Sequence, residues 1–213
     1  MSVPLQLSDD AIAGWYANKD FTADWTSWHF ANWVQILQPF RDMPAHILEI
    51  GSWEGRSALF FLNYLIHSRM VCVDTFGGNV EHHRNPYFAA LVPETERKFD
   101  ANTAEFAARI EKHKGPSSDV LPQLGIASRR FDIAYIDGSH RAADVYSDAV
   151  LTWPMVVANG VVIFDDYEFD QMEEEIERPK LGIDAFLKAI DAQYRLIHKD
   201  YQVVIEKIAG NSA

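Results

Sequence analysis

The distribution of apolar residues along the chain predicts buried strands separated by helices. Short apolar runs stand at His46–Ile50, Met70–Val73, Phe131–Ile136 and Val161–Phe164, and each is followed by glycine or aspartate. Runs of this length bounded by turn residues are typical of strands buried on both faces of a parallel sheet. Helices are expected between them at Arg56–His67, Ser117–Leu124 and Ala142–Val157, with a further short strand near Lys112–Lys114. This alternation predicts an α/β fold, with a doubly wound, mostly parallel sheet and helices on both faces.

Two segments in the N-terminal half of the chain, residues 1–45 and Thr75–Thr103, are less regular. Residues 1–45 are rich in aromatic side chains, and Ser8 and Asp24 are expected to cap helices at Asp9–Lys19 and Trp25–Leu37. Thr75–Thr103 contains several glycines and prolines, so we expect an excursion that carries one helix. A helix at Ala104–Ile110 should follow it.

The C-terminal part completes a single domain. We expect the run Glu173–Glu177 to be a solvated helix face, followed by a helix at Ile183–Asp191 and strands at Tyr194–His198 and Gln202–Glu206. No linker or repeat interrupts the chain. The prediction is therefore one domain over residues 1–213, in which 1–45 form an aromatic-rich helical segment and 46–213 the α/β core.

Charge and cysteine content exclude several partners. The 31 acidic residues against 19 Lys and Arg give a formal net charge of −12. Nucleic acids and anionic membranes are bound by clustered basic residues, so neither is expected here. Cys72 is the only cysteine, which excludes an intrachain disulfide and fits a cytoplasmic location. We see no secretory leader and no apolar run of about 18 residues that would span a membrane.

A glycine-rich turn follows the first predicted strand, at Glu49–Ser57. Gly51 permits a tight turn, and Gly55 lets the next helix start close to the strand with its N–H groups free for an anionic group. A phosphate-binding loop would need a lysine that is absent, and a dinucleotide fingerprint would need glycine where Trp53 stands. We therefore expect a ligand with a carboxylate and an amine.

An acidic residue, Asp74, ends the second predicted strand. In a doubly wound sheet an acid at this place can accept hydrogen bonds from the hydroxyls of a ribose. Taken singly, Gly51 and Gly55 could merely close a turn, and Asp74 could merely cap a strand. Together they favour a ligand that contains a nucleoside.

Three further acids follow the last parallel strands, Asp137 on one and Asp165 and Asp166 on its neighbour. The carboxyl ends of adjacent parallel strands lie on one edge of a sheet, where ligands bind. Because three carboxylates there repel one another, we expect a divalent cation with oxygen ligands, Mg²⁺ in the first place. His140 is a candidate proton acceptor. The alternatives, helix caps for the acids and a backbone-bonded histidine, remain open.

In this combination the segments resemble the class I S-adenosylmethionine-dependent methyltransferases, above all the metal-dependent O-methyltransferases of small molecules of the catechol and macrolide-sugar types. Glu49-x-Gly51-Ser52-x-x-Gly55-x-Ser57 is similar to the first motif of that family, Asp74 to its ribose-binding acid, and the segment from Gly115 to Leu121 to its adenine-proximal segment. The resemblance implies a seven-stranded sheet with one antiparallel edge strand. It also implies a cosubstrate site made of Glu49, Gly51, Ser52, Trp53, Gly55, Ser57, Asp74, Gly115, Ser117 and Ser118.

The resemblance further implies a reaction. A Mg²⁺ ion on Asp137, Asp165 and Asp166 would bind a hydroxyl of a small acceptor molecule, and His140 or Asp137 would take its proton. His140 stands where the catechol type has lysine, and Asp166 where that type has asparagine. The acceptor is therefore expected among sugars, phenols and natural-product intermediates.

Two other functions remain open. One is a nicotinamide-dependent oxidoreductase, against which Trp53 and the lack of a Tyr-x-x-x-Lys pair argue. The other is a non-catalytic binding or assembly module, against which the three retained acids argue. The N-terminal aromatic residues could line an acceptor pocket, pack onto the sheet or join two subunits in a homo-oligomer. His82 and His83 are expected as an exposed loop pair.

Overall fold

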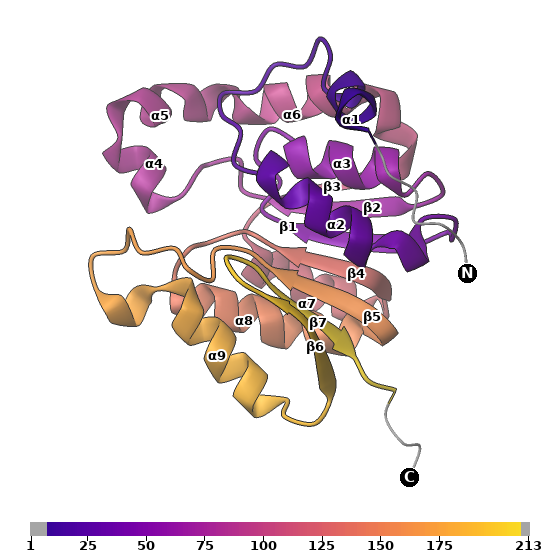
Figure 1. The fold of residues 1–213 in the computed structure, drawn as a ribbon. Helices are drawn as coiled ribbons and strands as arrows, with labels where there is room; N and C mark the ends of the chain where they lie inside the picture. Colours follow the sequence, from indigo (N-terminus) through magenta and orange to yellow (C-terminus); the bar gives the residue numbers. More distant parts are fainter. Residues whose placement is uncertain (1–7, 210–213) are drawn as a thin grey trace.

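The computed structural model describes residues 8–209 and confirms the α/β class (Figure 1). Its strands form one sheet of seven in the order β3-β2-β1-β4-β5-β7-β6. In chain order they are β1 His46–Ile50, β2 Arg69–Asp74, β3 Ile110–Lys114, β4 Phe131–Ile136, β5 Val156–Phe164, β6 Tyr194–Lys199 and β7 Val203–Lys207. The strand order reverses at β1 and β4, which is the place where doubly wound sheets bind ligands.

The register brings the predicted site acids to one edge of the sheet. Ile50 pairs with Val73 and Ile136, and Ile136 pairs with Phe164, so the residues that follow these strands emerge together. β7 is antiparallel and pairs with both β5 and β6. The antiparallel strand thus lies one place in from the edge, not at the edge as expected, because the second strand of the terminal hairpin returns to β5.

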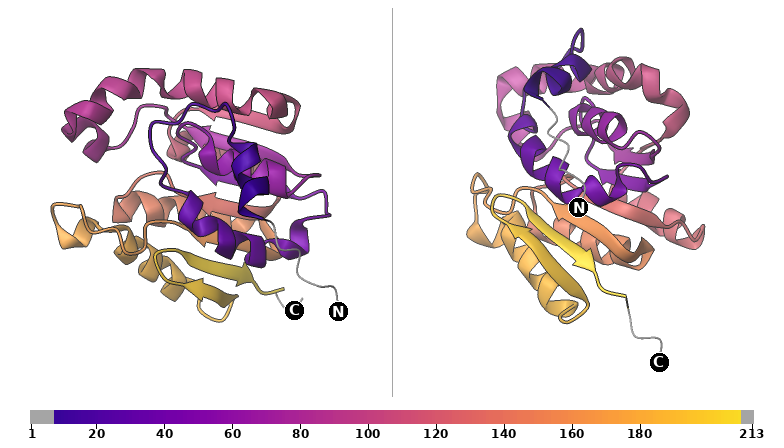
Figure 2. Two further views of the ribbon diagram at one scale, coloured as in Figure 1. Left: turned by 45° about the horizontal axis from the view of Figure 1, so that its top comes forward. Right: turned by 45° about the vertical axis from the view of Figure 1, so that its right-hand side comes forward.

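Helices cover both faces of the sheet, as the two views in Figure 2 show. One face carries α1 Asp9–Trp15, α2 Phe30–Ile36, α3 Arg56–Tyr64 and α6 Thr95–Thr103, and the other α7 Ser117–Ile126, α8 Ala142–Thr152 and α9 Pro179–Ala189. Trp33 of α2 is fully buried and stacks on Phe61 of α3 at 4.9 Å between ring centroids. Part of the N-terminal aromatic segment therefore packs onto the sheet, and a role in a homo-oligomer stays a prediction.

The N-terminal helices are shorter than expected. Ser8 caps α1 as predicted, since its hydroxyl accepts a hydrogen bond from the N–H of Ala11. α1 ends at Trp15 rather than Lys19. The expected helix Trp25–Leu37 is divided into a 3₁₀ turn, Ser27–His29, and α2. The Asp24 carboxylate accepts from the N–H groups of Thr26 and Ser27 and so caps the turn rather than a helix.

The prediction of one helix in Thr75–Thr103 is wrong. This segment contains α4 Val80–Arg84, α5 Pro86–Leu91 and α6, and a 3₁₀ helix at Ala104–Arg109 replaces the expected α-helix. Pro86 begins α5, because a proline needs no N–H at the first position of a helix and cannot continue the preceding one. The proline that suggested irregular structure is here the start of a new helix.

Two other boundaries are corrected in the second half of the chain. The expected helix Ala142–Val157 ends at Thr152, and β5 already begins at Val156, because Pro154 leads the chain into a 3₁₀ turn. The acidic run is no α-helix, since only Glu175–Glu177 form a 3₁₀ turn before Pro179 begins α9. Over residues 8–209, no helix combines the length and apolarity needed to cross a bilayer.

Candidate active site

A cavity of about 1440 Å³ opens at the carboxyl edge of the sheet, beyond β1, β2, β4 and β5. The predicted site residues that line it are Gly51, Trp53, Asp74, Gly115, Ser117, Ser118, Asp137, His140, Asp165 and Asp166. Glu49, Ser52, Gly55 and Ser57 are absent from this lining. The cavity thus gathers most of the predicted site, and four residues of the glycine turn lie behind its wall.

The turn after β1 needs glycine for two reasons. Gly51 has φ +85°, a left-handed conformation that residues with a side chain rarely adopt. A Cβ atom on Gly51 would also lie 1.9 Å from the carbonyl oxygen of Asp137. Trp53, at φ +45°, shares this strained turn. The turn is therefore packed directly against the chain that carries the second part of the site.

Glu49 braces the turn from below. Its side chain is fully buried and accepts hydrogen bonds from the hydroxyls of Ser52 and Ser57, at 2.5 and 2.6 Å. Burial raises the pKa of Glu49 to about 7, although both hydroxyls oppose the shift. The three side chains bond to one another, so the structure assigns them to the support of the turn. Their predicted contact with a cosubstrate stays a prediction.

Asp74 also holds the turn while facing the cavity. One carboxylate oxygen accepts from the N–H groups of Ser52 and Trp53, both at 2.7 Å, and the other from the N–H of Phe76. Burial raises the pKa of Asp74, and these three amides oppose it. Asp74 thus lies where a ribose would be bound, and its hydrogen bonds to a ligand remain a prediction.

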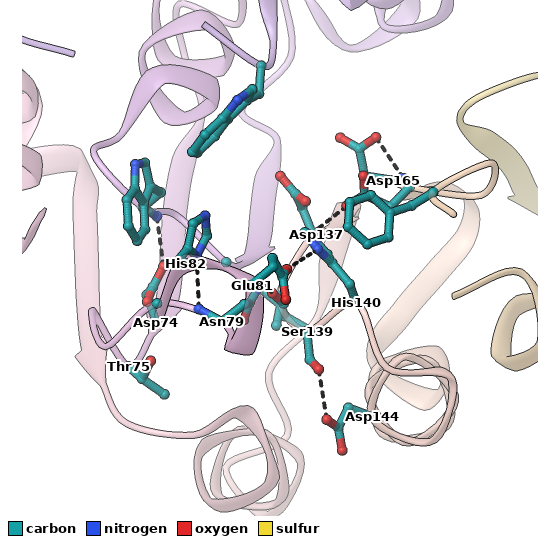
Figure 3. A pocket seen from close by; sticks show the side chains of 18 of the residues that line it. Asp74, Thr75, Asn79, Glu81, His82, Asp137, Ser139, His140, Asp144 and Asp165 are labelled. Atoms are coloured by element: carbon teal, nitrogen blue, oxygen red, sulfur yellow. Dashed lines mark hydrogen bonds and ion pairs between the residues drawn. The ribbon is translucent and has the colours of Figure 1, made fainter. Parts of the chain in front are cut away.

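A second group of polar side chains lies beyond β4 and β5. Ligand atoms of Asp137, His140 and Asp166 lie within 4.8 Å of one another. Nε2 of His140 is 2.8 Å from Asp166, and Nδ1 forms an ion pair with Glu81 of α4. Figure 3 shows the ion pair between His140 and Glu81, with Asp137 beside it. This cluster contains two of the three predicted metal ligands and the predicted base.

Asp165 lies beneath this cluster rather than in it. Its carboxylate is 8% exposed and accepts hydrogen bonds from the Tyr135 hydroxyl and from Nε2 of Gln202, the latter at 3.0 Å. The Tyr135 hydroxyl also lies 2.9 Å from Asp137, so one proton serves two carboxylates. Tyr135 thus joins Asp165 to Asp137. The role of Asp165 as a metal ligand together with Asp137 and Asp166 stays a prediction.

The electrostatics of the cluster reflect crowded negative charge. Burial, together with the charges of Asp165 and Asp166, raises the pKa of Asp137 well above its usual range. Burial and the charge of Asp166 raise the pKa of Asp165 to about 7. Burial opposes protonation of His140, but its bonds to Asp166 and Glu81 prevail and raise its pKa well above 6.5. Asp166 remains ionised, since its hydrogen bond to His140 outweighs burial and lowers its pKa.

An aromatic wall stands opposite the cluster. His82 stacks on Trp53 at 4.5 Å, and Trp25 lies 5.5 Å from His82 and 5.3 Å from Phe88. All four side chains line the cavity. The expectation of an exposed loop pair is therefore wrong for His82, which packs on the turn. His83 is exposed as expected, but both histidines lie in α4 and not in a loop.

Some cavity residues were not found from the sequence. Glu81 reaches His140 from α4, and Tyr201 donates a hydrogen bond to Asp166 at 2.9 Å from the loop before β7. Neither residue follows a predicted strand, which was the signal used for the other acids. Only the contact of Glu81 with His140 and that of Tyr201 with Asp166 identify them.

Comparison with known protein families identifies the family of this chain. A family described as "Methyltransferase domain" matches residues 48–167, more than half of the chain. The chain belongs to this family. Its matched region runs from β1 to the residues after β5 and includes the turn, Asp74 and the whole carboxylate cluster. The resemblance inferred from the motifs is thereby confirmed, and the oxidoreductase alternative is not favoured.

Individual relatives are distant. An uncharacterised protein of Acanthamoeba polyphaga mimivirus is 23% identical over 145 residues, which cover 66% of this chain and 59% of that protein. The chain thus spans less than two thirds of that relative's length.

Solved structures share the fold. MycE, a methyltransferase of the mycinamycin pathway in complex with Mg, SAH and mycinamycin VI, has a TM-score of 0.64 at 16% identity, over 92% of this chain and 53% of that one. The O-methyltransferase NovP has a TM-score of 0.62 at 18% identity, over 85% and 78%. TomG of Streptomyces achromogenes, an O-methyltransferase in complex with SAM, has 0.62 at 16% identity, over 87% and 81%.

Proposed function

We propose that this protein transfers a methyl group from S-adenosylmethionine to a hydroxyl oxygen of a small molecule, with a divalent cation at the carboxylate cluster. The observation that carries the proposal is one continuous cavity, with the glycine turn and Asp74 at one end and Asp137, His140 and Asp166 at the other. Support comes from two structures of the same fold, MycE in complex with Mg and SAH, and TomG in complex with SAM.

The glycine end suits the cosubstrate. Gly51 keeps the turn close to β4, so that the backbone can approach the methionine part of the molecule. Asp74 is the acid for the ribose hydroxyls, and Gly115, Ser117 and Ser118 form the cavity wall beyond it. Glu49, Ser52 and Ser57 fix the turn from behind, which keeps this end in shape before the cosubstrate arrives.

The donor set at the other end fits a hard cation. Carboxylate oxygens are the ligands that Mg²⁺ prefers, and Asp137 and Asp166 offer theirs from two adjacent strand ends, with Asp165 joined through Tyr135. Burial and mutual repulsion raise the pKa values of Asp137 and Asp165, and a cation bound between them would relieve that repulsion. Bound there, Mg²⁺ would lower the pKa of an acceptor hydroxyl.

We assign to His140 the role of the base that accepts the proton of that hydroxyl. It can accept a proton only as a neutral imidazole, so its two ion pairs must be weakened when the site is loaded. Glu81 orients the ring through Nδ1 and leaves Nε2 directed at Asp166. Asp137 is the competing base, and a variant of His140 that keeps full activity would favour it.

The test is methyl transfer from labelled S-adenosylmethionine to a panel of sugars, phenols and natural-product intermediates, with Mg²⁺ or with EDTA. We expect labelled product for at least one acceptor class with Mg²⁺, and an Asp166→Ala variant that loses it. Labelled product that is equal in EDTA and in the variant would remove the cation from the proposal. No product with any class would contradict O-methyl transfer.

We also propose a cytoplasmic location and leave the homo-oligomer as a prediction of the same kind. Cys72 is buried and free, as a thiol in a reducing compartment would be. Trp28 of the N-terminal segment is 61% exposed and lines the cavity, so a second subunit packed on this segment would lie beside the site. Sedimentation of the wild-type protein would measure the oligomeric state.

A further inference from the structure

One buried acid in the cavity belongs neither to the glycine turn nor to the carboxylate cluster. Asp148, on α8, is 3% exposed and lines the cavity near Ser117, where α7 and α8 pack against each other. An Oδ2 atom of Asp148 lies 3.6 Å from the position that a Cβ on Gly138 would occupy. The carboxylate is therefore directed at the space between the segments that follow β3 and β4.

Asp148 has no positive partner in the part of the chain that the structure describes. The influences on its pKa are burial, which raises it to about 6, the Ser117 hydroxyl, which lowers it, and the neighbouring Asp144, which raises it. No lysine, arginine or histidine is among them. A carboxylate buried to this extent is costly unless donors satisfy it, and beyond the Ser117 hydroxyl it can accept from a donor of a ligand in the cavity.

The donor can be identified from the chemistry of the proposed cosubstrate. S-adenosylmethionine carries three kinds of donor: the α-ammonium group, the ribose hydroxyls and the exocyclic amine of adenine. Asp74 at the end of β2 is placed for the ribose, and the methyl group has to face Asp137 and Asp166 beyond β4 and β5. The base then extends from the ribose toward Ser117, and its amine is the donor left for Asp148.

We propose that Asp148 accepts a hydrogen bond from the exocyclic amine of the adenine ring and makes the site select adenine over a base with a carbonyl at that position. The inference rests on the proposed function. A carbonyl oxygen in place of the amine turns a donor into an acceptor, and two acceptors cannot bond to each other. A single buried carboxylate therefore makes the site select a base with an amine at that position over a base with a carbonyl there.

The experiment compares two ligands by calorimetry, S-adenosylhomocysteine and S-inosylhomocysteine, which differ at this position of the base. Wild-type protein should bind the adenosyl compound at least about tenfold more tightly, the effect of one hydrogen bond to a charged group. Asp148→Asn should weaken adenosyl binding by about tenfold and reduce the preference below threefold, because its amide can donate to the carbonyl.

Asp144→Asn is the matched control. Asp144 lies one helical turn earlier on α8, its side chain is exposed, and it accepts a hydrogen bond from Ser139 at 2.8 Å. This variant should keep the wild-type preference. If Asp148→Asn does not fold, as judged by thermal unfolding, Asp148→Ser and the wild-type comparison of the two ligands still decide the question.

The outcomes separate the inference from the function on which it rests. Binding of the adenosyl compound without preference, or a preference that persists in the folded Asp148 variants, overturns the role of Asp148 and leaves the proposed function intact. Binding of neither ligand overturns both.

Discussion

The two ends of the cavity treat negative charge in different ways. At the glycine end, Asp74 accepts hydrogen bonds from three backbone N–H groups, and Glu49 accepts hydrogen bonds from two serine hydroxyls. The protein itself therefore satisfies both carboxylates. At the other end, Asp137 and Asp165 share the one hydroxyl of Tyr135, and burial together with repulsion keeps their pKa values high. The protein itself satisfies the acids of the glycine end, whereas the other end is where we propose a cation.

The largest effect is expected at the cluster, from His140→Ala. Loss of a general base lowers kcat by about 10²- to 10⁴-fold, so labelled-methyl assays should show a drop of that size. Binding of S-adenosylhomocysteine should change less than threefold, because His140 serves the acceptor side of the cavity. The matched control is His83→Ala, an exposed histidine of α4 that is bonded to the carbonyl of Gly77. Full activity of His140→Ala would contradict the assignment.

At the glycine end, Gly51→Ala should act on folding rather than on chemistry. The new methyl group would meet the Asp137 carbonyl at 1.9 Å in a left-handed backbone conformation. Overpacking of this kind costs about 3 kcal/mol of unfolding free energy, measurable in urea. Gly14→Ala, in α1 with no atom within 4 Å of the new Cβ, is the control and should not destabilise. Equal stability of both variants would mean that the turn is looser than described.

The bridge between the two buried acids is tested by Tyr135→Phe. Without the hydroxyl, Asp137 and Asp165 lose the group that holds their oxygens together. The dissociation constant for Mg²⁺, measured by calorimetry, should rise by about tenfold. Tyr64→Phe removes a hydroxyl bonded to the Val34 carbonyl, away from the cluster, and should leave the constant unchanged. If both variants bind Mg²⁺ like the wild type, Tyr135 has no part in the cation site.

The smallest effect concerns pH. Asp165 and Glu49 have pKa values of about 7 in the folded protein, against about 4 when unfolded. Between pH 4 and 7 the folded state therefore holds more protons, so stability without metal falls as the pH rises. Added Mg²⁺ should raise Tm more at pH 8 than at pH 5. Glu49→Gln should keep that Mg²⁺ response and Asp165→Asn should reduce it; the reverse pattern would contradict the contrast between the two ends.

Much of the fold follows from local sequence, because strands buried on both faces show as apolar runs. β4 begins and ends where predicted, at Phe131 and Ile136. The boundary between α8 and β5 was missed, since Trp153–Val157 are apolar in either structure and only Pro154 marks the change. The short helices α4 and α5 were missed because neither buries a residue, so no apolar periodicity marks them in the sequence.

The site was predictable to the extent that its residues follow strands. Asp74, Asp137 and Asp166 were found in this way, and the register brings them to one edge. The sequence could not reveal that Asp165 turns beneath the cluster while Asp166 faces the cavity, because this depends on the left-handed backbone of Asp166, at φ +59°. Glu81 and Asp148 lie on helices, where an acid is ordinarily a solvated surface residue.

The most direct test of the central claim is a calorimetric titration of the wild-type protein with S-adenosylhomocysteine. The account predicts saturable binding at one site per chain, lost in Gly51→Ala if that variant folds. No binding at millimolar concentration, with and without Mg²⁺, would contradict it.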